Sequence, residues 1–97
     1  MVTYVVLANF TEQGIRYAKE TPKRAEAFKQ MAKTFGTTVK ELYSTQGKYD
    51  IVTIVDAPDE SSAMALSLSL GAMGNVRTVS LRAFSAADMT EIVSKML

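Results

Sequence analysis

The residues best suited to chemistry gather around a short Gly-Lys-Tyr-Asp segment, residues 47–50, near the middle of the 97-residue chain. An aspartate carboxylate accepts hydrogen bonds and can act as a general base, and a tyrosine hydroxyl can orient a ligand or move a proton. Asp50 and Tyr49 are therefore the candidate catalytic residues. Arg77 carries a planar guanidinium that suits an anion, which makes it the candidate anion-binding residue.

The composition narrows the chemistry that these residues can share. The chain contains no cysteine and no histidine. Disulfides, thiolate nucleophiles, imidazole bases and Cys/His zinc sites are therefore excluded. We expect no bound metal and no cofactor, so that catalysis would depend on a carboxylate or a phenol. A carboxylate acts as a base near neutral pH only where burial raises its pKa.

The charge balance and the apolar segments limit the classes of partner that we expect. Eleven Lys and Arg against ten Asp and Glu give a net charge of +1, so we expect neither nucleic acid nor an anionic membrane as a partner. The longest uncharged run, residues 61–76, is shorter than the ~20 apolar residues that span a bilayer. The N-terminal segment lacks the basic start of a signal peptide, which favours a cytoplasmic location.

Four strands are expected to position the candidate residues. Residues 2–10 and 49–57 are apolar on both faces, as is typical of central strands. Residues 38–45 carry Lys40 and Glu41, which favours an edge strand, and residues 75–84 form the fourth strand. The short link at residues 46–48 predicts that the second and third strands pair antiparallel.

Three helices are expected between and after these strands. Thr21 and Pro22 are predicted as an N-cap and first helical residue, with Ala25, Phe28, Ala32 and Phe35 as the apolar stripe. Asp59 is expected to cap a second helix that ends near Gly71, and Ser85 with Asp88 predicts a capping box for a C-terminal helix. Residues 11–20 form either a short irregular helix or an ordered loop. The C-terminal stripe consists of Met89, Ile92, Val93 and Met96.

This element order predicts an α+β fold of the ferredoxin-like βαββαβ type, with an added C-terminal helix, in a single domain over residues 1–97. In that topology the first and third strands lie in the centre of the sheet. Two helices cover one face, so the apolar side chains of the other face need the extra helix or a second subunit. We therefore expect a homo-oligomer.

Chain direction places polar residues from several elements at one end of the predicted sheet. A cleft between strand ends and loops is a usual place for a small ligand. The alternative is structural: Asp50 braces the hairpin or pairs with Arg77, and the tyrosines pack across strands. The expected ligand-binding residues are Asn9, Thr11, Gln13, Tyr43, Gly47, Tyr49, Asp50, Asn75 and Arg77.

The Gly-Tyr-Asp signature at residues 47–50 resembles that of the GYD domain family of small bacterial and archaeal proteins. The resemblance extends over residues 9–16, 22–24, 52–59 and 70–78, and so covers nearly the whole chain. It implies a ferredoxin-like domain of the dimeric α/β-barrel type, in which two sheets pack face to face. It implies no activity, because the biochemical role of this family is unassigned.

Three functions are therefore open at the level of sequence. The first is an oligomeric domain that binds a small molecule or serves as an accessory protein. The second is a cofactor-free enzyme like the monooxygenases and isomerases of the dimeric α/β-barrel type, using Asp, Tyr and Arg. The third is a structural subunit without a ligand. Fold analogy alone does not choose between them.

Overall fold

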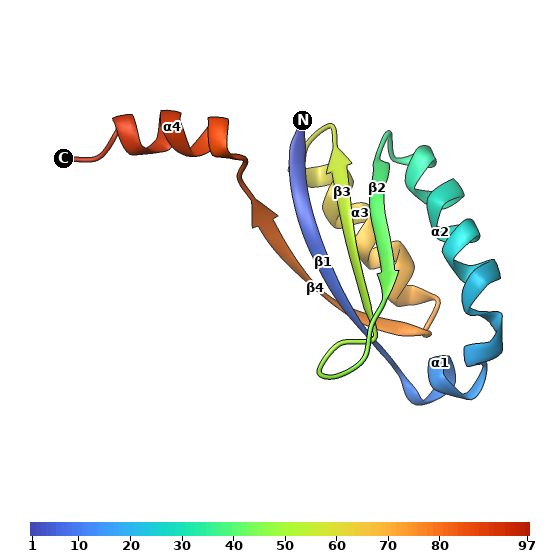
Figure 1. Ribbon diagram of the computed structural model, residues 1–97. Helices are drawn as coiled ribbons and strands as arrows, with labels where there is room; N and C mark the ends of the chain where they lie inside the picture. Colours follow the sequence, from blue (N-terminus) through green and yellow to red (C-terminus); the bar gives the residue numbers. More distant parts are fainter.

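The computed structural model describes residues 1–97, and its architecture is α+β, with a four-stranded antiparallel sheet and four α-helices (Figure 1). A short 3-10 turn at Ala18–Glu20 links the first two helices. The predicted ferredoxin-like fold is confirmed. The elements in chain order are β1 (Val2–Phe10), α1 (Glu12–Arg16), α2 (Thr21–Thr34), β2 (Thr38–Ser44), β3 (Ile51–Ala57), α3 (Glu60–Ala72), β4 (Val76–Ala83) and α4 (Ala86–Ser94).

The strand order in the sheet is β2-β3-β1-β4. The two strands whose sequences are apolar on both faces, β1 and β3, are therefore the central pair, as expected. Every neighbouring pair is antiparallel. The register places Leu7 between Val52 and Val79, and Val5 between Ile54 and Leu81. This register determines which side chains share a face of the sheet.

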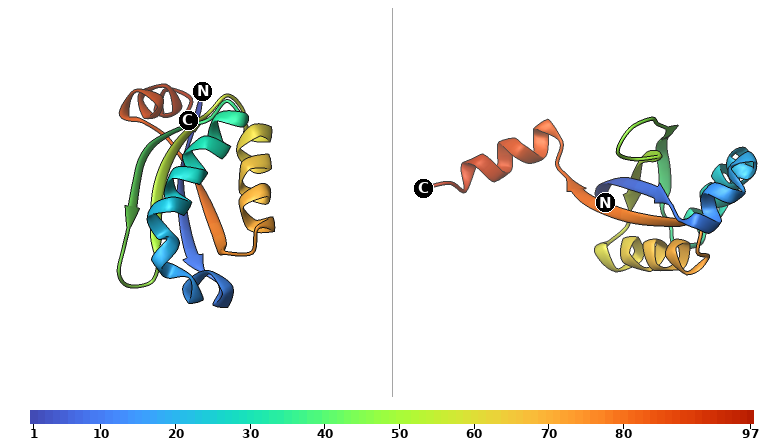
Figure 2. Two further views of the ribbon diagram at one scale, coloured as in Figure 1. Left: turned by 90° about the vertical axis from the view of Figure 1, so that its right-hand side faces the viewer. Right: turned by 90° about the horizontal axis from the view of Figure 1, so that it is seen from below.

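The helices α2 and α3 pack on the same face of the sheet, and the core lies between them and the strands (Figure 2). Phe28 and Ala32 from α2 and Leu66 from α3 are buried against Val6 and Val55 of the central strands. These residues come from the stripe that the sequence pattern identifies on α2 and from the inward positions of the strands. Burial of Val6, Val55, Phe28 and Leu66 stabilises the fold by about 1.5–3 kcal/mol each.

Helices α3 and α4 begin directly after their predicted N-capping residues. The Asp59 carboxylate accepts a hydrogen bond from the Ser62 amide at 2.7 Å, and Ser85 with Asp88 forms a complete capping box. The prediction for Thr21 is wrong in detail, because Thr21 is the first residue of α2 and Glu20 occupies the cap position. The 3-10 turn enters the helix directly, and the Thr21 hydroxyl instead donates to the Ala18 carbonyl.

The link between β2 and β3 is longer than predicted. The third strand begins at Ile51 rather than at Tyr49, so residues 45–50 form the connection. The Thr45 hydroxyl binds the Tyr49 carbonyl, which takes that carbonyl out of the strand ladder and closes the turn. The predicted antiparallel pairing of β2 and β3 is correct.

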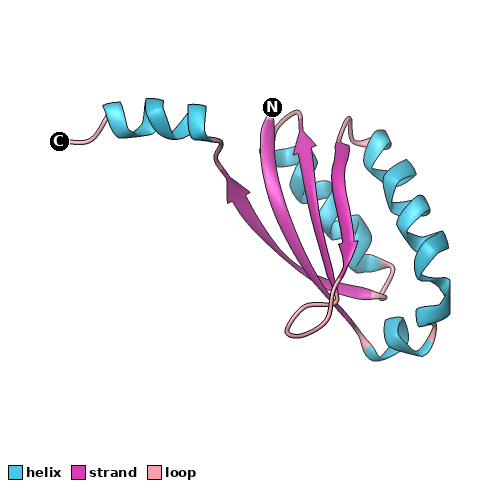
Figure 3. Ribbon diagram, in the orientation of Figure 1, coloured by secondary structure: helices cyan, strands magenta, loops and turns pink.

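The C-terminal helix α4 projects from the end of β4 and leaves the open face of the sheet uncovered (Figure 2). Every residue from Phe84 to Leu97 is exposed. Met89, Ile92 and Val93 of the predicted stripe face solvent in the single chain, with Ile92 36% and Val93 53% exposed. The prediction for Met96 is wrong, because α4 ends at Ser94 and Met96 lies beyond it. Figure 3 shows the helix as a separate arm joined to the sheet by a short loop. None of the helices is long and apolar enough to serve as a membrane span.

Candidate functional site

Asp50 joins the two central strands to the hairpin. Its carboxylate oxygen Oδ2 accepts a hydrogen bond from the Phe10 amide at 2.9 Å. Its own amide donates to the Ala8 carbonyl at 2.9 Å, and its carbonyl accepts from the Thr45 amide at 2.8 Å. Backbone and side chain of Asp50 thus bind both β1 and the residue after β2. This arrangement is the one expected of a residue that braces the hairpin.

The rest of the signature forms the tight part of the connection. The Thr45 hydroxyl donates to the Tyr49 carbonyl at 2.5 Å. Gly47 has a φ of 105°, a conformation that side chains rarely adopt, so the turn requires glycine there. The Lys48 ammonium lies 5.8 Å from the centre of the Tyr49 ring, within the range of a cation–π contact. Tyr49 is half-buried and Lys48 is exposed.

Asn9 and Arg77 lie directly opposite each other on β1 and β4. Both belong to the face of the sheet that α2 and α3 leave uncovered. Arg77 is exposed and forms no ion pair with Asp50. The guanidinium therefore remains available for a ligand or for a second subunit.

The residues near α1 form a separate hydrogen-bonded cluster with the end of α3. The Thr11 hydroxyl donates to the Gly74 carbonyl at 2.5 Å, and the Thr11 amide donates to the Asn75 carbonyl at 3.0 Å. The Gln13 amide nitrogen donates to the Asn75 side-chain oxygen at 2.9 Å and to the Met73 carbonyl at 3.2 Å. These contacts dock α1 onto the entry of β4.

Gly14 and Arg24 complete this junction, and neither is among the predicted site residues. A Cβ on Gly14 would lie 1.9 Å from the Asn75 carbonyl oxygen, so only glycine permits this approach. Arg24 on α2 donates to the Gly14 carbonyl at 3.0 Å. The sequence signal for Gly14 is a glycine within an otherwise polar connection, which indicates a close backbone approach but not its partner.

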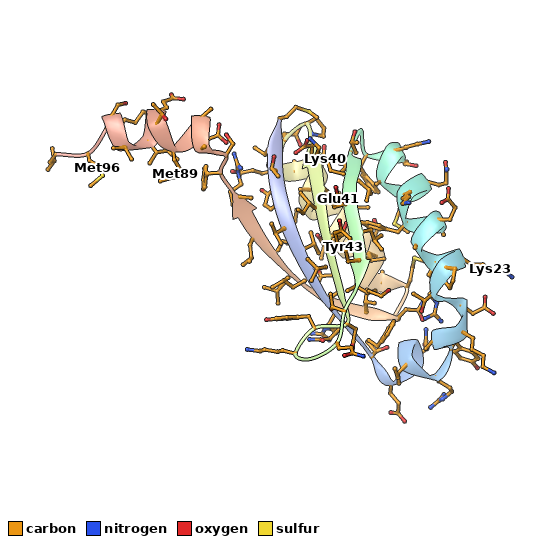
Figure 4. All side chains as sticks on the ribbon, viewed as in Figure 1. Lys23, Lys40, Glu41, Tyr43, Met89 and Met96 are labelled. Atoms are coloured by element: carbon orange, nitrogen blue, oxygen red, sulfur yellow. The ribbon has the colours of Figure 1, made fainter.

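Tyr43 lies apart from both clusters, on the edge strand β2 (Figure 4). Its hydroxyl donates to the Glu41 carboxylate at 2.8 Å. This hydrogen bond, together with the negative charge of Glu41, raises the pKa of the Tyr43 hydroxyl. The phenol is thus held protonated as a hydrogen-bond donor.

Some of the predicted site residues border pockets, and others brace the hairpin. Asn75 borders a cavity beneath α2, and Arg77 borders a groove between α3 and β4. Asp50 and Tyr49 line neither, and their contacts bind the hairpin to β1. Chain direction correctly indicates which strand ends meet, whereas the grouping depends on side-chain contacts that the sequence pattern does not contain.

The open face of the sheet carries two apolar rows between two polar ones. One row consists of Tyr43, Val52, Leu7 and Val79, and the next consists of Ile54, Val5 and Leu81, with the charged Glu41 of β2 opposite Ile54.

At one end of these rows stand Asn9 and Arg77. At the other end the Thr3 hydroxyl donates to the Asp56 carboxylate at 2.6 Å, and Lys40 pairs with the same carboxylate at 3.5 Å. Val79 and Leu81 are 49% and 48% exposed. An apolar patch with a polar border is typical of a protein interface.

Comparisons with known proteins identify a family and a relative of this chain. A curated protein of Thermus thermophilus, named glutamine synthetase and cystathionine beta-lyase binding protein, is 32% identical over 90 residues, which cover 92% of this chain and 95% of that protein. No solved structure matches the chain. The model of the GYD domain matches residues 4–93. With this match over nearly its whole length, the chain belongs to the GYD domain family.

Proposed function

We propose that this protein is an accessory protein that binds an enzyme, with glutamine synthetase as the first partner to test and cystathionine β-lyase as the second. The observation that carries the proposal is the relative from Thermus thermophilus, whose name states that it binds these two enzymes. The match to that relative covers 92% of the present chain. A binding role also agrees with the many large apolar side chains that the single chain leaves exposed.

The surface proposed for the enzyme is the projecting helix α4. Met89, Ile92, Val93 and Met96 follow the i, i+3, i+4, i+7 spacing of helices that lay an apolar face into a groove of a partner. Met96, two residues beyond the end of the helix at Ser94, is 72% exposed, and Figure 4 shows it with Met89 on the arm, clear of the sheet. The capping box at Ser85 and Asp88 supports the helix from its own residues.

The experiment is a titration of the purified enzyme against the immobilised full-length chain. The double variant Ile92→Glu/Val93→Glu places charges in the stripe and is expected to weaken binding at least tenfold. The control is Ala87→Glu, which adds a charge on the opposite side of the same helix. Equal binding by all three proteins would remove α4 from the interface, and no binding of either enzyme by the wild type would reject the accessory role.

A second proposal concerns the open face of the sheet, which we infer packs against the same face of a second copy. Support comes from the register, which brings Val52, Leu7 and Val79 into one row and Ile54, Val5 and Leu81 into the next, with polar residues at both ends. A closed dimer of this kind needs one self-complementary patch. Two sheets packed in this way would bury both apolar rows.

Sedimentation analysis tests the homodimer. The wild type is expected to sediment as a dimer at micromolar concentration, and Val79→Glu is expected to shift it to the monomer, because a carboxylate would be buried without a partner. Ser80→Glu, one residue along the same strand and on the other face, is the control and should remain dimeric. A wild type that sediments as a folded monomer would refute this interface.

A further inference from the structure

A cavity of about 100 Å³ lies between α2 and the covered face of the sheet. It borders the sheet end where β1 finishes and extends beneath the N-terminal half of the helix. Twelve of its 18 lining residues are hydrophobic, so it is an apolar space with a few polar groups at its border. Its apolar wall includes Ala8, Phe10 and Ile51 from the strands and Ala25, Phe28 and Met31 from α2.

The cavity follows from the residues that α2 presents to the sheet. Toward its C-terminal end the helix buries Phe28 and Ala32 in the core and is held close to β2. Toward its N-terminal end the lining positions are Thr21 and Ala25, whose side chains are too short to fill the space as the helix moves away from the strand (Figure 1). Protein interiors are otherwise closely packed, so this pocket is a space that a small apolar group can enter.

A cation stands at the border of this apolar space. Arg24 lines the cavity and is half-buried, and its Nη1 donates to the Gly14 carbonyl at 3.0 Å. None of the ion pairs in the structure includes Arg24. One hydrogen bond uses a single N–H of the five that a guanidinium offers, and the remaining fork matches a carboxylate. Asn75 adds an amide at the same border.

We propose that this cavity binds a short-chain aliphatic carboxylate, with its alkyl tail between α2 and the sheet and its carboxylate on Arg24. Size limits the tail, because a cavity of about 150 Å³ holds the six carbon atoms of benzene, so a 100 Å³ space takes about three to five carbon atoms. The half-buried guanidinium selects the anion over a neutral or cationic head of the same length. This site is separate from α4 and from the open face of the sheet.

The test compares the affinities of butyrate, 1-butanol and butylamine for the full-length protein. Binding is measured from the changes in its amide chemical shifts. Butyrate is expected to perturb residues of α2 and β1 and to bind at least tenfold more tightly than 1-butanol, since the two share a tail and differ in charge. Butylamine is expected to bind no more tightly than 1-butanol. Butylamine binding as tight as that of butyrate would overturn the proposal.

Two variants separate the charge from the space. Arg24→Gln is expected to reduce butyrate affinity to that of 1-butanol while 1-butanol still binds, which shows that the cavity remains formed. Ala25→Leu fills the space without touching the charge and is expected to abolish binding of both. Lys29→Gln, an exposed cation on the same helix, is the control and should leave both affinities within twofold.

Either of two results with the variants would overturn the assignment. One is a preference for butyrate over 1-butanol that persists in Arg24→Gln, and the other is undiminished binding of butyrate by Ala25→Leu. Absence of any shift up to about 50 mM butyrate would also overturn it, since a ligand of this size should bind in the millimolar range. Because none of these measurements involves an enzyme partner, their failure is distinguishable from failure of the accessory role.

Discussion

At the scale of single residues, one substitution distinguishes a bracing role of Asp50 from a binding role. Its carboxylate binds the Phe10 amide, so Asp50→Asn is expected to destabilise the fold by about 1–3 kcal/mol, the usual cost of a damaged charged hydrogen bond. Urea unfolding measures this change. Glu26→Gln, at an exposed position of α2, is the control and should remain within about 0.5 kcal/mol of the wild type.

A binding role for Asp50 would produce a different result. Polar groups held for a ligand often carry unfavourable electrostatics, so their removal leaves stability unchanged or raises it. An Asp50→Asn protein as stable as the wild type that no longer responds to a ligand of the wild type would contradict the bracing role. It would return Asp50, Tyr49 and Arg77 to consideration as one site.

Two glycines test whether the junction of α1 with β4 depends on a close backbone approach. Gly14→Ala places a methyl group 1.9 Å from the Asn75 carbonyl and is expected to destabilise by about 1–3 kcal/mol or more, as overpacking does. Gly71→Ala lies within α3, has open space around the new Cβ, and is expected to stabilise by about 0.5–1 kcal/mol. Thermal unfolding of the pair shows the opposite signs, and equal effects would disprove the close approach.

At the scale of elements, local signals in the sequence were sufficient where the structure depends on neighbouring residues. Asp59 and Ser85 cap the helices that follow them, because a cap involves residues three positions apart. The alternation of apolar residues likewise identified β1 and β3 as the central strands.

Capping residues and apolar alternation do not predict contacts between segments that are distant in the sequence. Gly14 contacts Asn75, which is more than half the chain away in sequence, and neither residue type indicates its partner. The cavity beneath α2 depends on the tilt of the helix. The direction of α4 depends on the backbone at Phe84 and Ser85, so sequence patterns predicted the helix but not its separation from the sheet.

The N-terminus of α3 predicts a pH dependence. Hydrogen bonds from the backbone and hydroxyl of Ser62 lower the pKa of Asp59 below its ordinary value of 3.8. A lowered pKa in the folded state means that the charged cap stabilises the protein fully above that ordinary value. The contribution is lost as the pH falls through the lowered folded pKa.

The variant Asp59→Asn keeps an acceptor oxygen but cannot titrate. It should be less stable than the wild type near neutral pH, with the difference vanishing in strong acid. Urea unfolding across the acid range measures the difference at each pH. A difference that stays constant with pH would show that the charge of Asp59 contributes nothing to the fold.

At the scale of the whole molecule, the projecting arm predicts a separation of folding from recognition. Residues 85–97 are all exposed, so a chain ending at Phe84 is expected to keep its fold and to self-associate like the wild type. Circular dichroism and sedimentation measure both. Binding of the enzyme partner should be lost in the same protein. A large fall in melting temperature would show instead that α4 is part of the stabilising core of the assembly.

The same arm has a consequence for how this protein can change over generations. A substitution in a packed core is limited by the stability it costs, and most such changes are removed for that reason. Residues such as Ile92 and Val93 face solvent in the chain, so their replacement is free of that limit. With the proposed binding surface on α4, a change of binding partner would require changes in a single terminal helix only, while the sheet and the helices packed on it are inherited unchanged.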